Sequence, residues 1–451
     1  MKLFFPHALL ADGWARDVGL DVEDGRVSAV HRGCDGAGRE RVSGIALPGL
    51  PNLHSHAFQR GMAGLTEVRG PEGDNFWSWR QLMYRFLSEI TPDDVESLAA
   101  QAYMEMLESG FTAVGEFHYL HHGPDGQPYA NLAEMAERIA AAAAETGIGL
   151  TLLPTLYAHS SFGGAPPTEG QRRFLNDAPR FARLLDASQA AVNNVPDAAC
   201  GVAPHSLRAV SPELLREVLA AARGPVHMHV AEQIKEVEDC IAWSGARPVE
   251  WLMAHADVNP RWCLIHATHM TDRETTALAA TGAVVSLCPI TEANLGDGIF
   301  NGVTYHGAGG RFGVGTDSNV EITAPGELKQ LEYGQRLGQR VRNALGRQKG
   351  ESSGRLLYDA ATSAGTRPLA RAIGALAPGL RADIVVLRSD LPEMAAVSGD
   401  RWLDQFVFAQ GARAIDRVYA GGRLVVAEGR HVHRSAIVGR FARTFARLAS
   451  A

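Results

Sequence analysis

Residues 47–56 read Leu47-Pro48-Gly49-Leu50-Pro51-Asn52-Leu53-His54-Ser55-His56. Apolar residues flanked by turn-forming residues are typical of a short buried strand. The strand ends in His54 and His56, and a spacing of two places both imidazoles on the same side of a strand. Because imidazole is a preferred ligand of zinc and neighbouring divalent metals, the pair predicts one half of a metal site.

Three more apolar segments end in a residue suited to metal binding or to acid–base chemistry. The first reaches His229, with Glu232 three residues further on. The second stops at His266 and the third at Asp317. In a β/α barrel the C-terminal ends of the parallel strands meet on one face, which is where barrel enzymes catalyse their reactions. The four segments therefore predict a single site at one end of a barrel.

Strand-like and helix-like segments alternate between residues 47 and 366. Helical periodicity is clear at 92–109 and 131–146, among others. Eight such units favour a closed α/β fold, a (β/α)8 TIM-type barrel over 47–366, rather than an open sheet. The candidate strands are 47–53, 111–117, 148–156, 200–204, 225–230, 262–266, 283–288 and 311–316.

The two flanks of the barrel are rich in short strands. Residues 1–46 have turns at 11–13 and 23–25, and residues 367–451 contain the apolar runs 382–387 and 416–426. We therefore expect one small β-sandwich domain built from 1–46 and 367–451, with a helix from about residue 435.

Composition excludes several classes of protein. The chain has 451 residues, a net charge of −7 and no basic run, which argues against nucleic-acid binding. No segment approaches the ~18 consecutive apolar residues that a membrane span requires. The cysteines are odd in number and far apart, as in a cytoplasmic protein with reduced thiols; they are Cys34, Cys200, Cys240, Cys263 and Cys288.

Taken together, these residues resemble the amidohydrolase superfamily, and within it the mononuclear deaminases. The motif that carries the resemblance is His54-x-His56, His229-x-x-Glu232, His266 and Asp317, in that order. A closer resemblance is to the formimidoylglutamate deiminases of histidine breakdown. It depends on residues 53–60, 115–119, 203–208 and 315–319.

The resemblance implies a role for each matched residue. One divalent metal ion per subunit, expected to be zinc, would be held by His54, His56, His229 and Asp317. Glu232, His266 and Asp317 would be catalytic. Substrate would contact Gln59, Arg80, Tyr119, His205 and Arg208. The resemblance also implies a homodimer.

The chemistry of hydrolytic deamination explains these residue types. A metal held by three imidazoles and one carboxylate leaves room for a water, whose pKa falls from 15.7 towards ~7. Asp317 can accept the proton of this water, and Glu232 can carry a proton to the departing nitrogen, because ammonia leaves only when protonated. His266 can hydrogen-bond the nucleophile or the developing tetrahedral centre. A two-metal variant uses a lysine on the fourth strand, and 200–205 has none, so one metal is favoured.

The resemblance implies hydrolysis of a linear amidine. N-formimidoyl-L-glutamate, a small dicarboxylate, would give N-formyl-L-glutamate and ammonia. Arginine suits such a substrate because its planar fork meets a carboxylate with two hydrogen bonds, and Arg80 and Arg208 are the candidates. A purine or other ring deaminase is the alternative, and would clamp a flat base with aromatic or amide groups. A non-catalytic scaffold is a remote third, because such proteins lose metal ligands and none is missing here.

Some assignments have a structural alternative. Arg208 could be an ion-pair partner, and Tyr119 could pack at the rim. His227 would fill the barrel, and His269 would lie at the surface or behind the ligands. We expect positions in solvent or at the rim for His118, His121, His122 and His159.

Overall fold

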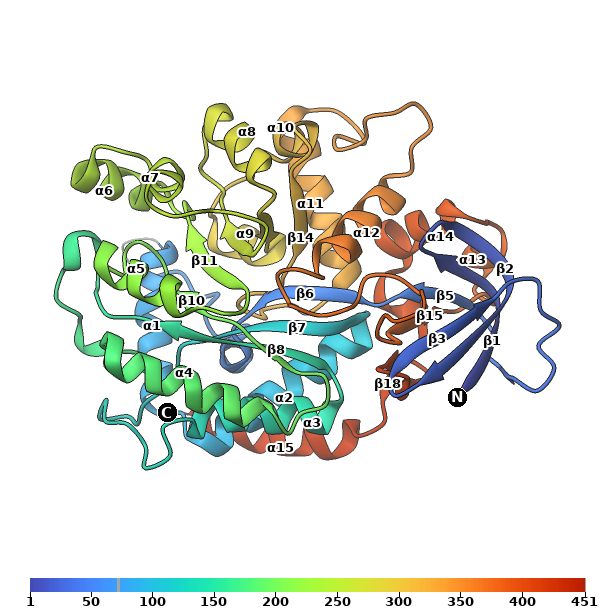
Figure 1. The fold of residues 1–451 in the computed structure, drawn as a ribbon, viewed down its shortest axis with the longest axis horizontal. Coiled ribbons are helices and arrows are strands. Elements are labelled where there is room, and N and C mark those ends of the chain that lie inside the picture. Colours follow the sequence, from blue (N-terminus) through green and yellow to red (C-terminus); the bar gives the residue numbers. More distant parts are fainter. Residues whose placement is uncertain (71–73, 451) are drawn as a thin grey trace.

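A computed structural model describes residues 1–70 and 74–450. An α/β barrel fills the centre of the molecule, and a sheet made from both ends of the chain lies beside it (Figure 1). None of the helices in the described residues is long and apolar enough to cross a membrane.

The barrel has eight strand positions around its axis. Two parallel sheets run in the orders β10-β8-β7-β6 and β11-β12-β13-β14, and short β9 pairs with β8. Isolated bridges join the sheets at both seams, between Ser55 and Asp317 and between Val202 and Val226. The strands are β6 (Leu50–Ser55), β7 (Phe111–His118), β8 (Gly149–Leu156), β9 (Ala199–Cys200), β10 (Ala203–Pro204), β11 (Val226–Val230), β12 (Trp262–His266), β13 (Val284–Leu287) and β14 (Arg311–Val314).

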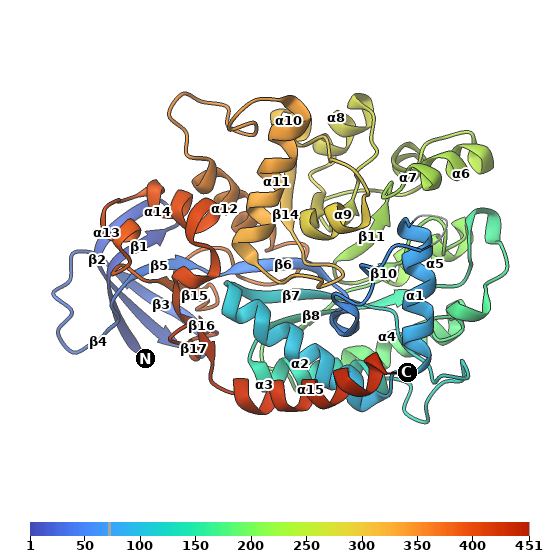
Figure 2. The ribbon, with the colours of Figure 1, turned by 180° about the vertical axis from the view of Figure 1, so that it is seen from behind.

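Helices follow the strands and surround the barrel (Figures 1 and 2). The predicted helix 92–109 is α2 (Pro92–Ser109), which begins with a capping box at Thr91 and ends at Gly110 in the left-handed conformation, φ 103°. The other helices around the barrel are α3 (Glu134–Thr146), α4 (Ala178–Val192), α5 (Pro212–Ala221), α6 (Ile234–Ser244), α7 (Pro248–His255), α8 (Asp272–Thr281), α9 (Pro289–Leu295), α10 (Gly302–Gly307), α11 (Ala324–Gln339) and α12 (Ser353–Ala364).

Both ends of the chain contribute to one nine-stranded sheet, in the order β18-β17-β16-β15-β5-β1-β2-β3 with β4 beside β1. It has its own apolar core, which includes Leu3, Phe5 and Val386. A β-sandwich form and the boundaries 1–46 and 367–451 stay predictions. The strands are β1 (Lys2–Leu10), β2 (Gly13–Glu23), β3 (Arg26–His31), β4 (Glu40–Arg41), β5 (Ile45–Pro48), β15 (Ile384–Leu387), β16 (Ile415–Ala420), β17 (Arg423–Ala427) and β18 (Arg430–His431).

Two short helices, α13 (Pro392–Ala395) and α14 (Asp400–Gln405), connect β15 to β16. The last helix, α15 (Arg434–Ala449), packs along α2 of the barrel (Figure 2). Ion pairs hold it there: Arg434 with Glu108, Arg440 with Glu145 and Arg447 with Asp94. The end of the chain is therefore anchored to the barrel.

Candidate active site

The end of β6 is clamped to the end of β14. The carbonyl of His54 accepts the backbone N–H groups of Thr316 and Asp317, both at 3.0 Å, and the N–H of His56 donates to the carbonyl of Asp317 at 2.9 Å. The amide of Asn319 donates to the carbonyl of His56 at 3.0 Å. Three of the predicted ligands, His54, His56 and Asp317, are therefore held in place by the same group of backbone hydrogen bonds.

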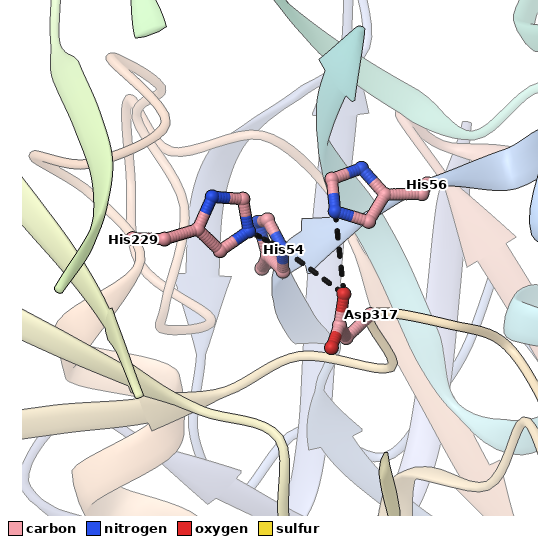
Figure 3. A group of neighbouring side chains, drawn as sticks. All are labelled: His54, His56, His229 and Asp317. Carbon is pink, nitrogen blue, oxygen red and sulfur yellow. Dashed lines mark hydrogen bonds and ion pairs between the residues drawn. The ribbon is translucent and has the colours of Figure 1, made fainter. Parts of the chain in front are cut away.

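Four predicted metal ligands converge inside the barrel mouth (Figure 3). The Oδ1 atom of Asp317 lies 3.2 Å from Nε2 of His54 and 3.3 Å from Nε2 of His56. Nε2 of His229 lies 3.1 Å from Nε2 of His54. The ligand atoms of all four residues lie within 4.8 Å of one another.

Hydrogen bonds behind the rings fix which nitrogen faces the centre. Nδ1 of His56 donates to the carbonyl of Phe117 at 2.9 Å, and Nδ1 of His229 donates to the carbonyl of His205 at 3.0 Å. Both rings therefore present an Nε2 lone pair, as metal-binding histidines do.

The charges of this group suit a cation. Burial lowers the pKa of His54 to about 3, so its ring is neutral. Burial alone would raise the pKa of Asp317, but the hydrogen bond from His54 and nearby imidazoles hold it below its usual range. Neutral nitrogen lone pairs 3.1 Å apart repel unless a proton or a metal ion lies between them. Three imidazoles and one carboxylate are a donor set that zinc accepts, so the residues fit a metal ion.

The backbone has an unusual conformation at two of the functional residues. His266, at the end of β12, has φ 66°, and Asp317, after β14, has φ 44°. Non-glycine residues rarely adopt this left-handed region, and such strain concentrates at functional sites. The strain here turns both side chains out of the strand direction and into the barrel mouth.

Glu232 and His266 lie beside the metal ligands and are both buried. Nε2 of His266 is 3.6 Å from Oε1 of Glu232 and 3.8 Å from Oδ2 of Asp317. Burial raises the pKa of Glu232, which suits a group that must carry a proton at neutral pH. Burial opposes a charge on His266, but the carboxylates of Glu232 and Glu292 outweigh it and raise its pKa to about 10.

A cavity leads from the metal ligands towards solvent. Nε2 of Gln59 donates to the hydroxyl of Tyr119 at 2.9 Å. Nη2 of Arg208 lies 3.3 Å from Oε2 of Glu232, so the ion pair considered as an alternative for this arginine is present. All five predicted substrate residues line the cavity: Gln59, Arg80, Tyr119, His205 and Arg208.

The long loop after the first predicted strand runs through residues 77–80 and is of the kind that forms lids or substrate walls, and it contributes to the apolar wall of this cavity. Helix α1 (Phe76–Ser88), in the long loop after β6, supplies much of it. The guanidinium groups of Arg80 and Arg208 both lie over the ring of Trp77, 4.6 Å and 5.7 Å from its centroid. No motif marked the other wall residues, which are Phe76, Met83, Tyr84, Tyr157, Phe174 and Leu295.

The predicted solvent or rim positions of three histidines were wrong: His118, His121 and His122 are buried. Nε2 of His121 bonds the carbonyl of Thr155, and Nε2 of His122 that of Leu175, both at 3.0 Å. These residues pack beneath loops whose folding back onto the barrel has no sequence signature.

His227 fills the barrel as predicted, bonded to the carbonyl of Pro368 at 2.8 Å. His269 bonds the carbonyl of Asp297, and His159 is half-buried.

The model of the amidohydrolase family matches residues 45–425. The chain belongs to the amidohydrolase family. This amidohydrolase is 50% identical, over 95% of each chain, to formimidoylglutamate deiminase of Pseudomonas aeruginosa. It is 29% identical to 8-oxoguanine deaminase of the same organism, over 95% of this chain and 93% of the other.

Solved structures agree with the fold. An amidohydrolase from Brucella melitensis superposes with a TM-score of 0.94 at 51% identity, over 99% of each chain. An adenosine deaminase from Xanthomonas campestris with bound zinc has a TM-score of 0.82 at 22% identity, over 100% of this chain and 98% of that one. The second likeness concerns the fold alone.

Proposed function

We propose that this amidohydrolase is a formimidoylglutamate deiminase, which hydrolyses N-formimidoyl-L-glutamate to N-formyl-L-glutamate and ammonia. The observation that carries the proposal is the 50% identity to a protein of that name over 95% of both chains. Two arginines in the cavity beside the metal ligands support it, because the substrate has two carboxylates.

His54, His56, His229 and Asp317 would hold one divalent ion, which we propose to be zinc. When bound, the ion would supply a water activated for attack at neutral pH. Asp317, whose second oxygen lies 3.8 Å from Nε2 of His266, would accept the proton of that water. Glu232 would deliver a proton to the amino nitrogen of the formimidoyl group, which then leaves as ammonia. His266 would stabilise the tetrahedral centre by a hydrogen bond from Nε2 to the oxygen that has added to the carbon.

The carboxylates of the substrate need partners. Burying a carboxylate without a partner costs about 3 kcal/mol or more of binding free energy. Arg80 and Arg208 are the cationic side chains that line the cavity in the described residues. Gln59, Tyr119 and His205 would complete the contacts to substrate.

A ring deaminase is the second candidate. The aromatic wall of the cavity and the 29% identity to an 8-oxoguanine deaminase favour it. A flat base, however, carries no carboxylate for Arg80, and Arg208 would then have only its ion pair with Glu232. The complete ligand group argues against a non-catalytic scaffold.

Further properties belong to the same proposal. The reaction would be a step of histidine degradation, in the cytoplasm, by a homodimer. The sheet of both termini would be a small β-sandwich domain of residues 1–46 and 367–451, beside a barrel of residues 47–366.

An ammonia-release assay with purified zinc-loaded protein tests the function. The substrates would be N-formimidoyl-L-glutamate, N-formimidoyl-L-aspartate, N-formimidoylglycine, guanine and adenosine. We expect the highest kcat/KM with formimidoylglutamate. Faster turnover of a purine would overturn the deiminase in favour of the ring deaminase. Active preparations without metal, or metal-loaded protein without activity on any substrate, would contradict the proposed chemistry.

A further inference from the structure

A buried glutamate outside the cavity contacts a catalytic side chain. Glu292, on α9, is 5% exposed. Its Oε1 accepts a hydrogen bond from Nδ1 of His266 at 3.1 Å. The same oxygen accepts the backbone N–H of Cys288, the residue before α9, at 2.9 Å. One carboxylate oxygen thus ties the catalytic histidine of β12 to the turn that follows β13.

The position of Glu292 separates it from the substrate. In the described residues, this cavity is lined by the metal ligands His56, His229 and Asp317 and by the carboxylate of Glu232, but not by Glu292. Of the side chains that Glu292 contacts, His266 is the one assigned a catalytic role, so Glu292 would act on the reaction through this histidine. A residue that acts only through another side chain is a positioning residue, whereas a catalytic residue contacts the substrate itself.

The hydrogen bond at Nδ1 of His266 determines which way Nε2 of the same ring faces. A ring that donates from Nδ1 to a carboxylate is held in one orientation. In that orientation Nε2 faces Glu232 at 3.6 Å and Asp317 at 3.8 Å. Nε2 has no hydrogen-bond partner among the described residues, so it is available to a reacting atom. Without its partner, the ring of His266 could rotate about χ2 and lose this alignment.

The backbone at His266 gives a second reason for such an anchor. Its φ of 66° is unfavourable for a side chain with a Cβ, and Ala267 follows at 50°. Such a conformation persists only where surrounding contacts hold it. The bond to Glu292 is one of those contacts.

We propose that Glu292 is a positioning residue of the deiminase, which holds the ring of His266 so that Nε2 faces the reacting centre. The proposal rests on the proposed function, since it assigns a partner to the catalytic histidine of that function. It adds a residue of α9 to the metal ligands and catalytic residues, which otherwise stand at the ends of β6, β11, β12 and β14.

Two substitutions separate geometry from charge. Glu292→Gln keeps an oxygen that can accept from both His266 and Cys288 but removes the charge. Glu292→Leu removes the acceptor. Glu274→Gln is the matched control, because Glu274 is a buried glutamate of α8 that pairs with Arg247 at 2.7 Å, away from the cavity.

We expect Glu292→Leu to lower kcat on formimidoylglutamate by about a hundredfold or more, the usual contribution of one acid–base group. KM and zinc content should stay close to the parent. Glu292→Gln should recover most of kcat, and Glu274→Gln should leave kcat unchanged. A Glu292→Leu enzyme that is folded and retains kcat within roughly threefold would overturn the proposal.

A measurement without substrate completes the test. In zinc-loaded protein labelled with ¹⁵N-histidine, the Nδ1 proton of His266 can be identified by its absence in His266→Gln. We expect its resonance to shift in Glu292→Gln, because a neutral amide replaces the carboxylate, and not in Glu274→Gln. An unchanged resonance in Glu292→Gln would overturn the proposal even if Glu292→Leu fails to fold. Absence of deiminase activity in the parent would instead overturn the proposed function, and the resonance test would still stand.

Discussion

The metal-binding half of the site stands on strands, whereas the substrate half stands on a helix and loops. His54 and His56 are locked to the seam between β6 and β14 by backbone hydrogen bonds. Arg80 instead projects from α1, in the long connection after β6, and Arg208 from the segment after β10. A rigid half can impose geometry on a metal, while an adaptable half can be changed to fit another substrate. Substitutions in the two halves should therefore have different consequences.

The largest effect is expected in the rigid half. His229→Ala removes one of three nitrogen ligands, so metal content should fall and turnover should be lost. Metal analysis of the purified variant and the ammonia assay measure both. His227→Gln is the control, because His227 lies on the same strand but bonds the carbonyl of Pro368. Full metal occupancy with normal activity in His229→Ala would refute the ligand assignment.

Glu232 lies where the two halves meet, since it contacts both His266 and Arg208. Glu232→Gln preserves shape but cannot exchange a proton, so kcat should fall by about 10²–10⁴-fold. Metal content should be normal, and substrate should still bind, as isothermal titration can measure. A rate within a few-fold of the parent would mean that the proton travels by another route.

The substrate half should respond through specificity. Arg208→Lys and Arg80→Lys should each weaken kcat/KM for formimidoylglutamate by at least about tenfold, or ~1.4 kcal/mol, with metal content intact. The loss should shrink for an analogue that lacks the matching carboxylate. Arg172→Lys, at an exposed ion pair with Glu169, should have no effect. Equal parent and variant activity on both substrates would favour a ring deaminase.

The smallest effect is expected at the start of α1. The side chain of Asn75 accepts hydrogen bonds from the N–H groups of Trp77 and Ser78, at 2.9 and 3.2 Å. Asn75→Ala should cost about 1 kcal/mol of helix stability and lower kcat/KM by no more than roughly fivefold. Ser88→Ala, at the other end of α1, should change nothing. A change in metal content in Asn75→Ala would show that the two halves are not independent.

The same division explains what the sequence could predict. Positions on strands have a fixed spacing, so His54 and His56 could be placed on one side of a strand from the sequence alone. Periodicity also located the helix at 92–109 to the residue. Both features arise from local backbone geometry, which the sequence expresses directly.

The wall of the cavity depends on contacts between segments far apart in the chain. Tyr157 and Phe174 meet Tyr84 only after the loops fold back over the barrel. His121 and His122 are buried for the same reason. No periodic pattern encodes such packing, so polar residues in loops were expected to be exposed.

Glu292 was missed although a signal was present. Strand 283–288 was the seventh of the eight predicted strands and was not given a functional residue of its own. Pro289 begins a helix directly after it, and Glu292 follows within the first turn. Since strand ends carry the chemistry of a barrel, an acidic residue there could have been considered.

The sheet formed from both termini has a consequence for biosynthesis. Strand β5 pairs with β1 on one side and with β15 on the other. The contact between the last helix and the barrel also forms late in synthesis, because Asp94 and Arg447 are 353 positions apart in the chain. At about 5 to 20 residues per second, a ribosome needs roughly 20 to 70 s to make the chain between them.

Until β15 has been made, the free edge of β5 offers unpaired N–H and C=O groups to any neighbouring chain, and such edges promote aggregation. Ribosome-bound chains that end before residue 384 should therefore be markedly more prone to aggregate than those that have released β15. The yield of this enzyme in a cell should then depend less on the stability of its finished barrel than on how well its first strands are shielded until its last ones arrive.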